Sequence, residues 1–489
     1  MNDDQRINFI QSALDNHNDY WDSREPIMTK LREAYMTQFY KGHGNAFSDA
    51  MIKVEVSEGY SYIESTIGSL FTQAPGVEIG RDPANSTADP DAAETLVNRF
   101  LQRKRQSLED CSRLALIYPC GFLKLAPRQS NDPLERVDIR TVEPWNIIVD
   151  SEADSWETQR FCAHVYWLPV SEAKARFGAR TFIPVPKTDY FDKQANRRDG
   201  TRQQQLPDEF LYVQIVEMYD LIHDELVFWS PEYAKGKKLL DRNSIPVRNW
   251  DDTPLPGMIP MYFSRVPGKP LEGYSSLRRI YDQITEKNYA RSRMANNVRR
   301  DARQFLYNKE LLDDNSLQAI ATGQDGLMIP VEGPLDGAIR AITVPPMNHN
   351  HGRYLDEIQG DLQRGSIMAP FTRGEATKST ATEVSLLQQY TSSEIGRLAR
   401  NRDEAIERLA NVYLRMLVVA LDEDTQIMID VEDQGTVVTT EMLEGKFVIS
   451  ALDGASTPVG DWLRQNALVS IGPLLIELGA NPKAVREEL

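Results

Sequence analysis

The segment TRGEATKSTATEV, residues 372–384, comes closest to a known chemical motif. It places Lys378, a serine and a threonine after Gly374, which is how a phosphate-binding loop ends. Such a loop needs glycines one and six positions before the lysine, because its backbone N–H groups must curl around the phosphates. Those two positions hold Thr377 and Thr372. The sequence therefore predicts a polar loop rather than a nucleotide site, and no cofactor.

A second group of residues could hold a divalent cation through oxygen atoms. Asp150, Glu152 and Asp154 alternate as the ligands of a calcium loop do. An EF-hand loop requires glycine at its sixth position, and Ser155 stands there. We therefore expect an acidic surface turn and no metal.

The six histidines form no recognisable catalytic or metal-binding arrangement. His349 and His351 could share an ion, but no third ligand is evident beside them. His164 lies in a dense apolar run beside Tyr166 and Trp167, which favours a core histidine with a satisfied hydrogen bond. Motifs of serine hydrolases, zinc proteases and dithiol enzymes are absent from the sequence. We expect that the protein is not an enzyme.

The stretch RSRMANNVRRDAR, residues 291–303, is the densest basic segment and the one candidate for a local nucleic-acid contact. On a helix, Arg291 falls near Arg299 and Arg303, while Arg293 and Arg300 share a different face. Arginines spread around a helix in this way favour ion pairs with acidic neighbours over insertion into a DNA groove.

Composition narrows the class of protein further. The chain has 489 residues, 41% of them hydrophobic and 26% charged, as expected of a globular protein of two to four domains. Its net charge of −17 disfavours a protein that grips DNA through a broad basic face. No apolar run approaches the roughly 18 residues that span a bilayer, and the first residues do not resemble a secretory signal. Three cysteines without metal spacing suggest reduced thiols.

The periodicity of apolar residues predicts a helical first part followed by strands. Helices are expected at 7–14, 27–35, 54–71 and 92–116, and strands at 121–125, 137–142, 147–150 and 161–168. Residues 212–229 are expected to form a hairpin that turns at 223–225, and 182–207 an exposed loop. After residue 270, helices are expected at 277–298, capped by Ser275 and Ser276, and at 353–368. A small α/β insertion lies between them, with a helix at 311–321 and strands at 327–331 and 338–344.

The clearest single element is a helix over residues 380–421, which would be roughly 60 Å long. Val384, Ile395, Ile406 and Leu417 recur every eleven residues, close to three full turns, so they share one stripe. This pattern favours an amphipathic helix packed on its own domain. Strands at 426–431 and 446–449 and a final helix at 462–478 complete the expected elements.

The order of these parts resembles that of the portal proteins of tailed bacteriophages, the head-to-tail connector family. The local signals are VEPWNIIVDSEAD (142–154), PGKPLEGYSSLRRIYDQITEKN (267–288) and TRGEATKSTATEVSLLQQ (372–389). The resemblance implies an α+β, portal-like fold with an α/β wing, paired stem helices, a small α/β clip, a tunnel loop and one very long amphipathic helix. On this chain the parts would be the wing at 1–273, the first stem helix at 274–299, the clip at 300–350, the second stem helix at 351–371, the tunnel loop at 372–380, the long wing helix at 381–421, further wing strands at 422–460, and a short crown or C-terminal helix at 461–489.

The resemblance also implies roles for particular residues. The DNA-facing tunnel loop would present Arg373, Gly374, Glu375 and Lys378. The stem would place Lys287, Arg291 and Arg293 at the channel or at subunit contacts. The clip would pair Met328, Ile329 and Val344 between neighbouring subunits.

By the same resemblance the chain would be the structural portal of a capsid vertex, assembled in the host cytoplasm and retained in the virion. It would form a homo-oligomeric ring, a dodecamer, through which double-stranded DNA is packaged and ejected without sequence specificity. Its partners would be the terminase large subunit, head-tail adaptors, and the major capsid and scaffolding proteins, with no membrane. The alternatives are another head-tail connector or tail ring subunit, or, with less support, a nucleotide-driven DNA motor.

Overall fold

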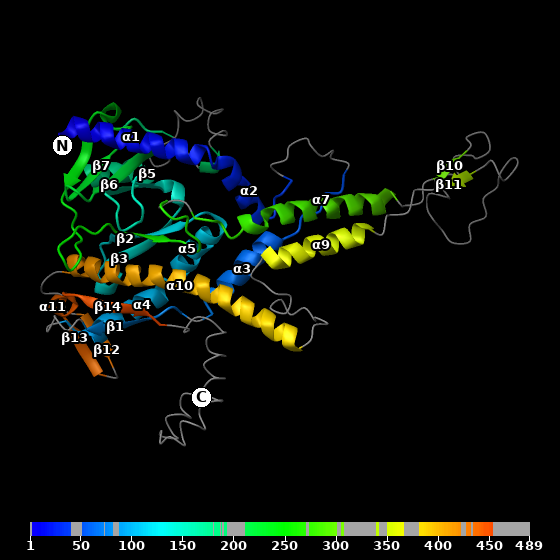
Figure 1. Ribbon diagram of the computed structural model, residues 1–489. Coiled ribbons are helices and arrows are strands. Elements are labelled where there is room, and N and C mark those ends of the chain that lie inside the picture. Colours follow the sequence, from blue (N-terminus) through cyan, green and yellow to red (C-terminus); the bar gives the residue numbers. More distant parts are fainter. Residues whose placement is uncertain are drawn as a thin grey trace, which may run out of the picture.

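The protein has a mixed α+β fold in which two helices extend away from a body of sheets and helices (Figure 1). The computed structural model describes residues 2–40, 51–72, 74–81, 88–178, 180–185, 187, 190–192, 211–269, 273–300, 305–307, 339–341, 350–365, 381–421, 427–431 and 434–452. The helix expected at 311–321, the strand at 327–331 and the helix at 462–478 lie outside these residues. The same holds for most of the loop expected at 182–207.

One half of the body is built on a five-stranded antiparallel sheet. Its strands run in the order β4 (Ile147–Val149), β5 (Phe161–Pro169), β6 (Tyr212–Asp220), β7 (Glu225–Trp229) and β8 (Leu239–Asn243). Helix α1 (Asp3–Asp22) packs Ile7, Ile10 and Leu14 on one face, and α6 (Val170–Phe177) covers part of the other. The strands predicted at 147–150 and 161–168 and the hairpin at 212–229 are confirmed, whereas β8 and α6 were not predicted.

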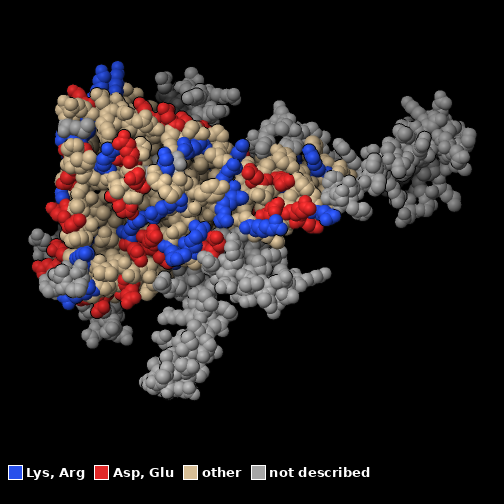
Figure 2. Space-filling model, viewed as in Figure 1, with Lys and Arg blue, Asp and Glu red and all other residues tan. Residues whose placement is uncertain are grey.

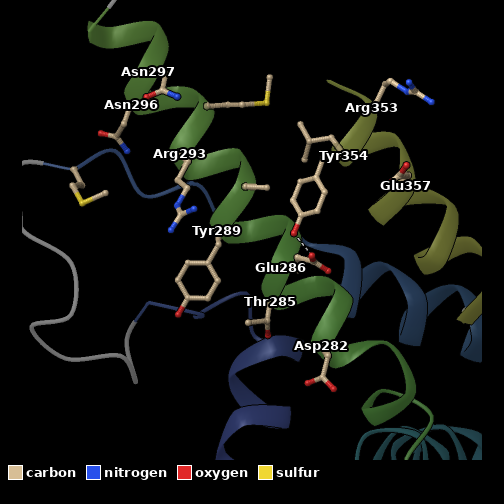
Figure 3. A pocket seen from close by; sticks show the side chains of 14 residues that line it. Asp282, Thr285, Glu286, Tyr289, Arg293, Asn296, Asn297, Arg353, Tyr354 and Glu357 are labelled. Carbon is tan, nitrogen blue, oxygen red and sulfur yellow. Dashed lines mark hydrogen bonds between the residues drawn. The ribbon is translucent and has the colours of Figure 1, made fainter. Parts of the chain in front are cut away.

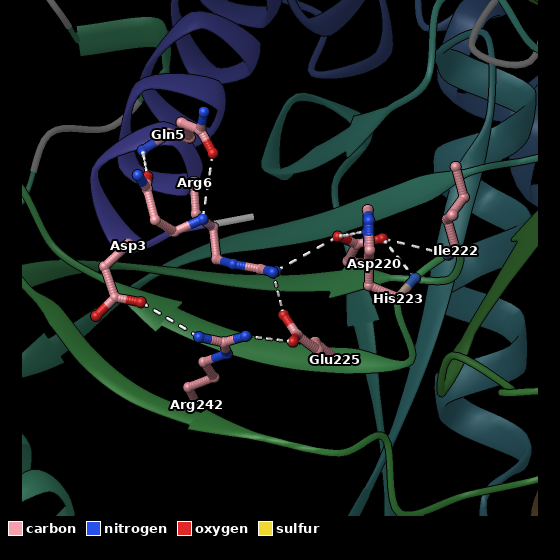
Figure 4. A network of polar contacts seen from close by, with 9 residues as sticks. Asp3, Gln5, Arg6, Asp220, Ile222, His223, Glu225 and Arg242 are labelled. Carbon is pink, nitrogen blue, oxygen red and sulfur yellow. Dashed lines mark hydrogen bonds and ion pairs between the residues drawn. The ribbon is translucent and has the colours of Figure 1, made fainter.

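Helix α1 is also joined to this sheet by a buried polar network (Figure 4). The Arg6 side chain is only 2% exposed and forms ion pairs with Asp220, at 3.4 Å, and with Glu225. Arg242 of β8 extends the network, at 2.5 Å from Glu225 and 3.3 Å from Asp3. The arginine thus places the first turn of α1 over the β6–β7 hairpin.

The other half of the body contains a three-stranded sheet of β3 (Val137–Val142), β2 (Gly121–Pro127) and β9 (Met258–Met261). Helices α4 (Pro90–Arg103) and α5 (Arg105–Ile117) precede it. The single helix predicted for 92–116 is therefore wrong. Lys104 leaves helical geometry at φ −105° and ψ 17°, and its Nζ binds Asp138 at 2.9 Å, so the chain bends between the two helices.

Helix α10 (Ala381–Ala420) runs along this half of the body (Figure 1). Its predicted stripe is confirmed where side chains are described, because Ile395, Ile406 and Leu417 are buried. Polar side chains of α10 also donate to body carbonyls. Arg397 and Asn401 both reach the Phe263 carbonyl, at 2.9 and 2.8 Å.

Two short ribbons lie beside α4 and α10. Strand β1 (Val77–Arg81) pairs with β14 (Phe447–Ala451), and β12 (Ile427–Val431) pairs with β13 (Gln434–Val438). Helix α11 (Thr440–Leu443) connects β13 to β14. The strands predicted at 426–431 and 446–449 are confirmed, but β1 and β13 were not predicted.

Helices α2 (Glu25–Tyr35) and α3 (Glu58–Leu70) lie where the body meets the projecting pair. That pair consists of α7 (Arg278–Arg300) and α9 (Asn350–Gly365). Figure 1 places the small ribbon of β10 (Phe305–Tyr307) and β11 (Ile339–Ala341) beyond their far ends. The helices predicted at 277–298 and 353–368 are confirmed with shifted ends.

Candidate functional site

The projecting helix pair is anchored to the body at the start of α7. Ser275 accepts a hydrogen bond from the Arg278 amide at 3.1 Å and donates one to the Ile117 carbonyl at 2.6 Å. The serine therefore caps α7, as its sequence predicts, and also ties the helix to the end of α5. Leu277 and Ile280 are almost fully buried there.

Contacts between α7 and α9 are partly apolar and partly ionic. Ile358 and Leu362 of α9 are each 2% exposed and join the main core cluster together with Ile284 of α7. The Lys287 ammonium lies 2.5 Å from Glu58 of α3 and 2.5 Å from the side-chain oxygen of Gln359. Lys287, predicted at the channel or a subunit contact, is therefore bound within its own chain and links α7 to both neighbouring helices.

A row of polar side chains on α7 holds the extended segment 51–57, called the strap here. Asn288, Ser292 and Asn296 are four residues apart, so they face the same side of the helix. They accept hydrogen bonds from the backbone amides of Val56, Val54 and Ile52 at 2.8, 2.9 and 2.9 Å. The Asn296 amide also donates to the Ile52 carbonyl at 2.9 Å. Helix side chains thus bind the strap backbone as a neighbouring strand would.

Removing these side chains should release the strap. We expect Asn288→Ala with Asn296→Ala to cost about 1 kcal/mol of strap stability per lost hydrogen bond. Hydrogen exchange at the amides of residues 52–56 should then accelerate about tenfold or more. Asn297→Ala, one position farther along α7, is the matched control and should leave this exchange unchanged. Equal protection in the double variant and the control would show that the row does not hold the strap.

A cleft of about 1400 Å³ follows α7, with Met51 of the strap in its lining, and reaches the first turns of α9 (Figure 3). In Figure 3 the Tyr354 hydroxyl points across to Glu286, to which it donates a hydrogen bond that raises the tyrosine pKa. The further lining mixes both signs of charge with amides and aromatic rings. It includes Asp282, Tyr289, Arg293, Asn296, Asn297, Arg353 and Glu357. No nucleophile with an activating base lies in this lining, so its chemistry suits contact with another polar surface.

The two other predicted stem residues differ from Lys287. Arg291 and Arg293 are both exposed, and Arg293 lines the cleft. The ion pairs that the sequence suggested for them are not found in the described part of the chain. The predicted loop residues Arg373, Gly374, Glu375 and Lys378, and the predicted clip residues Met328, Ile329 and Val344, lie outside the described residues.

The acidic turn predicted at 150–154 forms as a turn, closed by an arginine. Arg160 Nη2 lies 2.9 Å from Asp150 and 2.6 Å from Glu152, and Asp150 also accepts the Glu152 amide at 3.1 Å. The arginine hydrogen bond holds the pKa of the Asp150 carboxyl below its usual value. Within the described ranges, no three potential ligands gather as a metal site would need.

His164 belongs to a buried charged cluster that joins β2, β5 and β6. Lys124 Nζ lies 2.7 Å from Glu217 and donates to the His164 ring at 3.0 Å. Burial first, and then the lysine charge, lowers the pKa of His164 to about 3, so the ring is neutral at pH 7. The prediction of a core histidine with a satisfied hydrogen bond is confirmed.

The three cysteines are free and buried, as expected of reduced thiols. Burial raises the pKa of each thiol. A protonated, enclosed thiol is a poor nucleophile, so none of them adds chemistry to the cleft.

Surface charge is mixed on the face shown in Figure 2. Basic and acidic side chains alternate over the body, and acidic ones gather over the middle of the helix pair. On α7 and α9, the acidic residues Asp282, Asp356, Glu357 and Asp361 are exposed. Among the described helices, none is both long and apolar enough to span a bilayer.

Comparisons with known proteins give a partial similarity to a solved structure. No protein-family model matches the chain, and no curated protein matches it. A chain in the solved structure described as "Neck of empty GTA particle computed with C6 symmetry" is similar to 73% of this chain over 78% of its own length. The sequence identity is 11% and the TM-score 0.41. A similarity of this strength establishes no function, so the function must be argued from the chain's own residues.

Proposed function

We propose that the protein is the subunit of a portal-type ring at a capsid vertex, through which double-stranded DNA passes. The observation that carries the proposal is the projecting pair of α7 and α9. These antiparallel helices leave an α+β body, the β10–β11 ribbon lies beyond their far ends, and the 40-residue α10 then runs back along the body. This succession corresponds to the stem, clip, stem and long wing helix that the sequence suggests.

The surface of the pair supports contact between copies of the chain. Arg291 and Arg293 are exposed without a carboxylate partner in the described part of the chain, while Asp356 and Glu357 of α9 are exposed. Exposed charges of both signs on one projecting unit can pair with those of a neighbouring copy in a ring, which fixes their register. In this arrangement the 1400 Å³ cleft is a surface that the next copy covers.

The negative net charge suits a channel through which DNA slides better than a surface that binds DNA tightly. Twelve copies at −17 each would carry roughly 200 formal negative charges. A mostly repulsive wall lowers the barrier between successive positions of the duplex, so DNA slides without sticking. A few loop cations would then be enough to hold or brake it. No catalytic step is part of this proposal, and the packaging enzyme would be a separate partner.

A second candidate function is another connector ring of the head-tail junction. Such a ring would share the oligomeric architecture without a DNA-facing loop at 372–380. The two candidates therefore differ in what happens when the loop cations are removed.

Alanine at both Arg373 and Lys378 tests this difference. Because the two cations would contact passing phosphates, we expect the double variant to lose DNA packaging or retention by about tenfold or more while still forming rings. The matched control replaces two exposed body cations, Arg140 and Lys269, and should package normally. Normal packaging by the loop variant would favour the other connector ring, and failure to form rings would contradict the role given to the loop.

A further inference from the structure

A small cavity lies at the C-terminal end of α4, remote in sequence from the projecting pair. Its volume is about 220 Å³, and three separate segments line it. Helix α4 contributes Arg99 and Phe100, the short 3-10 helix η2 (Pro133–Glu135) contributes Leu134, and α10 contributes Tyr413. Figure 1 shows α4 beside α10, so the cavity closes only when the long helix is in place.

Tyr413 provides an unpartnered polar atom in this cavity. The residue is 1% exposed, and its ring stacks on Phe100 with centroids 4.0 Å apart. Its hydroxyl makes no hydrogen bond to a described residue and is not fully enclosed, so it can face the cavity. Burial raises the pKa of this hydroxyl, and the nearby charges of Arg103 and Asp132 act on it in opposite directions. An O–H donor is therefore available to a bound group.

Two arginines line the cavity together with Tyr413, and Arg103 is close enough to act on the pKa of its hydroxyl. Arg99 has no carboxylate partner in the described part of the chain, and Arg103 has only a long 3.7 Å contact with Asp132, in which both side chains are about half exposed. Lys104 also lines the cavity, but its ammonium is bound to Asp138 at 2.9 Å. Arg99 is therefore available to bind an anion, and Arg103 would exchange its long contact with Asp132 for one.

The remaining lining sets the size and charge of a ligand. Leu96 is fully buried and Leu134 partly buried, so the floor is apolar. Glu135 is exposed at the rim, where its negative charge would repel a bound anion and disfavour ligands with further negative charges. Arginine pairs with phosphate or carboxylate oxygens through two parallel N–H groups, but only phosphate has enough oxygens to accept from both arginines and from the Tyr413 hydroxyl at once.

We propose that this cavity is a phosphate-binding site, in which Arg99, Arg103 and the Tyr413 hydroxyl donate to the phosphate oxygens. The phosphate group would be either the free ion or the end of a small monoester whose carbon atoms contact Leu134. Binding would join α4, η2 and α10 through one ligand. The site is independent of the ring function proposed above, since it needs only a folded monomer.

The test is calorimetric titration of the purified full chain with inorganic phosphate and, separately, with glycerol phosphate. We expect saturable binding with a dissociation constant on the order of 1 mM or tighter. Tighter binding of glycerol phosphate would identify a monoester as the ligand class, and tighter binding of inorganic phosphate the free ion. Absence of saturation by either compound up to about 10 mM would overturn the proposal.

Variants assign the binding to this cavity. Tyr413→Phe keeps the stacked ring and removes one hydrogen bond, so binding should weaken about fivefold. Arg99→Gln should weaken it about tenfold or more, and Glu135→Gln should tighten it by removing a repelling charge. Arg140→Gln, an exposed arginine on β3 outside the cavity, is the matched control. Binding that is unchanged in Tyr413→Phe and Arg99→Gln would place the phosphate elsewhere and contradict the proposal.

Discussion

Replacing Lys124 with methionine should destabilise the fold by about 3–5 kcal/mol at pH 7. The lysine side chain is 9% exposed and that of its partner Glu217 is 7% exposed. Methionine fills a similar volume but leaves the carboxylate buried without its cationic partner, although the Tyr219 hydroxyl still donates to it at 2.8 Å. Denaturant unfolding measures the loss. The double variant with Glu217→Gln should recover most of the stability, because it removes the unpaired charge.

The pH dependence of this loss follows from the carboxyl group. Burial alone would raise the pKa of Glu217, but the Lys124 charge and hydrogen bond outweigh it and lower the pKa to about 2, from its ordinary value of 4.5. A depressed carboxyl pKa stabilises the fold above the unfolded value, and this contribution is lost as the pH falls through the folded value. Without the lysine, burial would dominate and the carboxyl would accept a proton more readily. The difference between wild type and Lys124→Met should therefore begin to shrink above pH 4.5, where the variant's carboxyl takes up a proton, and shrink further below pH 4.5, where the wild type loses its contribution. A difference that stays constant from pH 7 to pH 3 would contradict the pairing.

Gly273→Ala should strongly destabilise the fold, because it adds a methyl group where the body connects to the projecting pair. A Cβ there would lie 1.9 Å from the Pro119 carbonyl oxygen and 2.7 Å from that of Ser264. Both obstacles are backbone atoms, so the first turn of α7 or the end of α5 must move. We expect a loss of about 3 kcal/mol, the upper part of the range for overpacked sites, measured by denaturant unfolding.

The same substitution at Gly360 provides the control for Gly273→Ala. Nothing lies within 4 Å of a Cβ at Gly360, on the middle of α9. Alanine there should stabilise the helix by about 0.5–1 kcal/mol because it restricts the unfolded chain. If Gly273→Ala unfolded at the same denaturant concentration as wild type, the close seating of α7 on α5 would be refuted.

Several elements could be predicted because their signals are local. The eleven-residue recurrence of Ile395, Ile406 and Leu417 needs no knowledge of partners, so α10 was placed within one residue at each end. The β6–β7 hairpin followed from two apolar runs around His223 and Asp224. The capping role of Ser275 followed from its position before an apolar stripe.

Other features depend on partners that are distant in sequence. Strand β1 is half exposed, and its only partner in the described sheet is β14, about 370 residues later. The break between α4 and α5 at Lys104 depends on the contact with Asp138. The cavity beside Tyr413 depends on where η2 lies. The row of Asn288, Ser292 and Asn296 had a usable signal, since three small polar residues recur every four positions. Their target, the strap backbone, leaves no pattern in the sequence.

Native mass measurement of the purified full chain over a range of protein concentrations, with particles imaged on the same sample, tests the ring proposal most directly. The proposal predicts closed rings of about twelve copies with a central channel, in which the α7–α9 pairs line or flank the bore. A stable dimer, or a compact particle without a channel, at every concentration would contradict it.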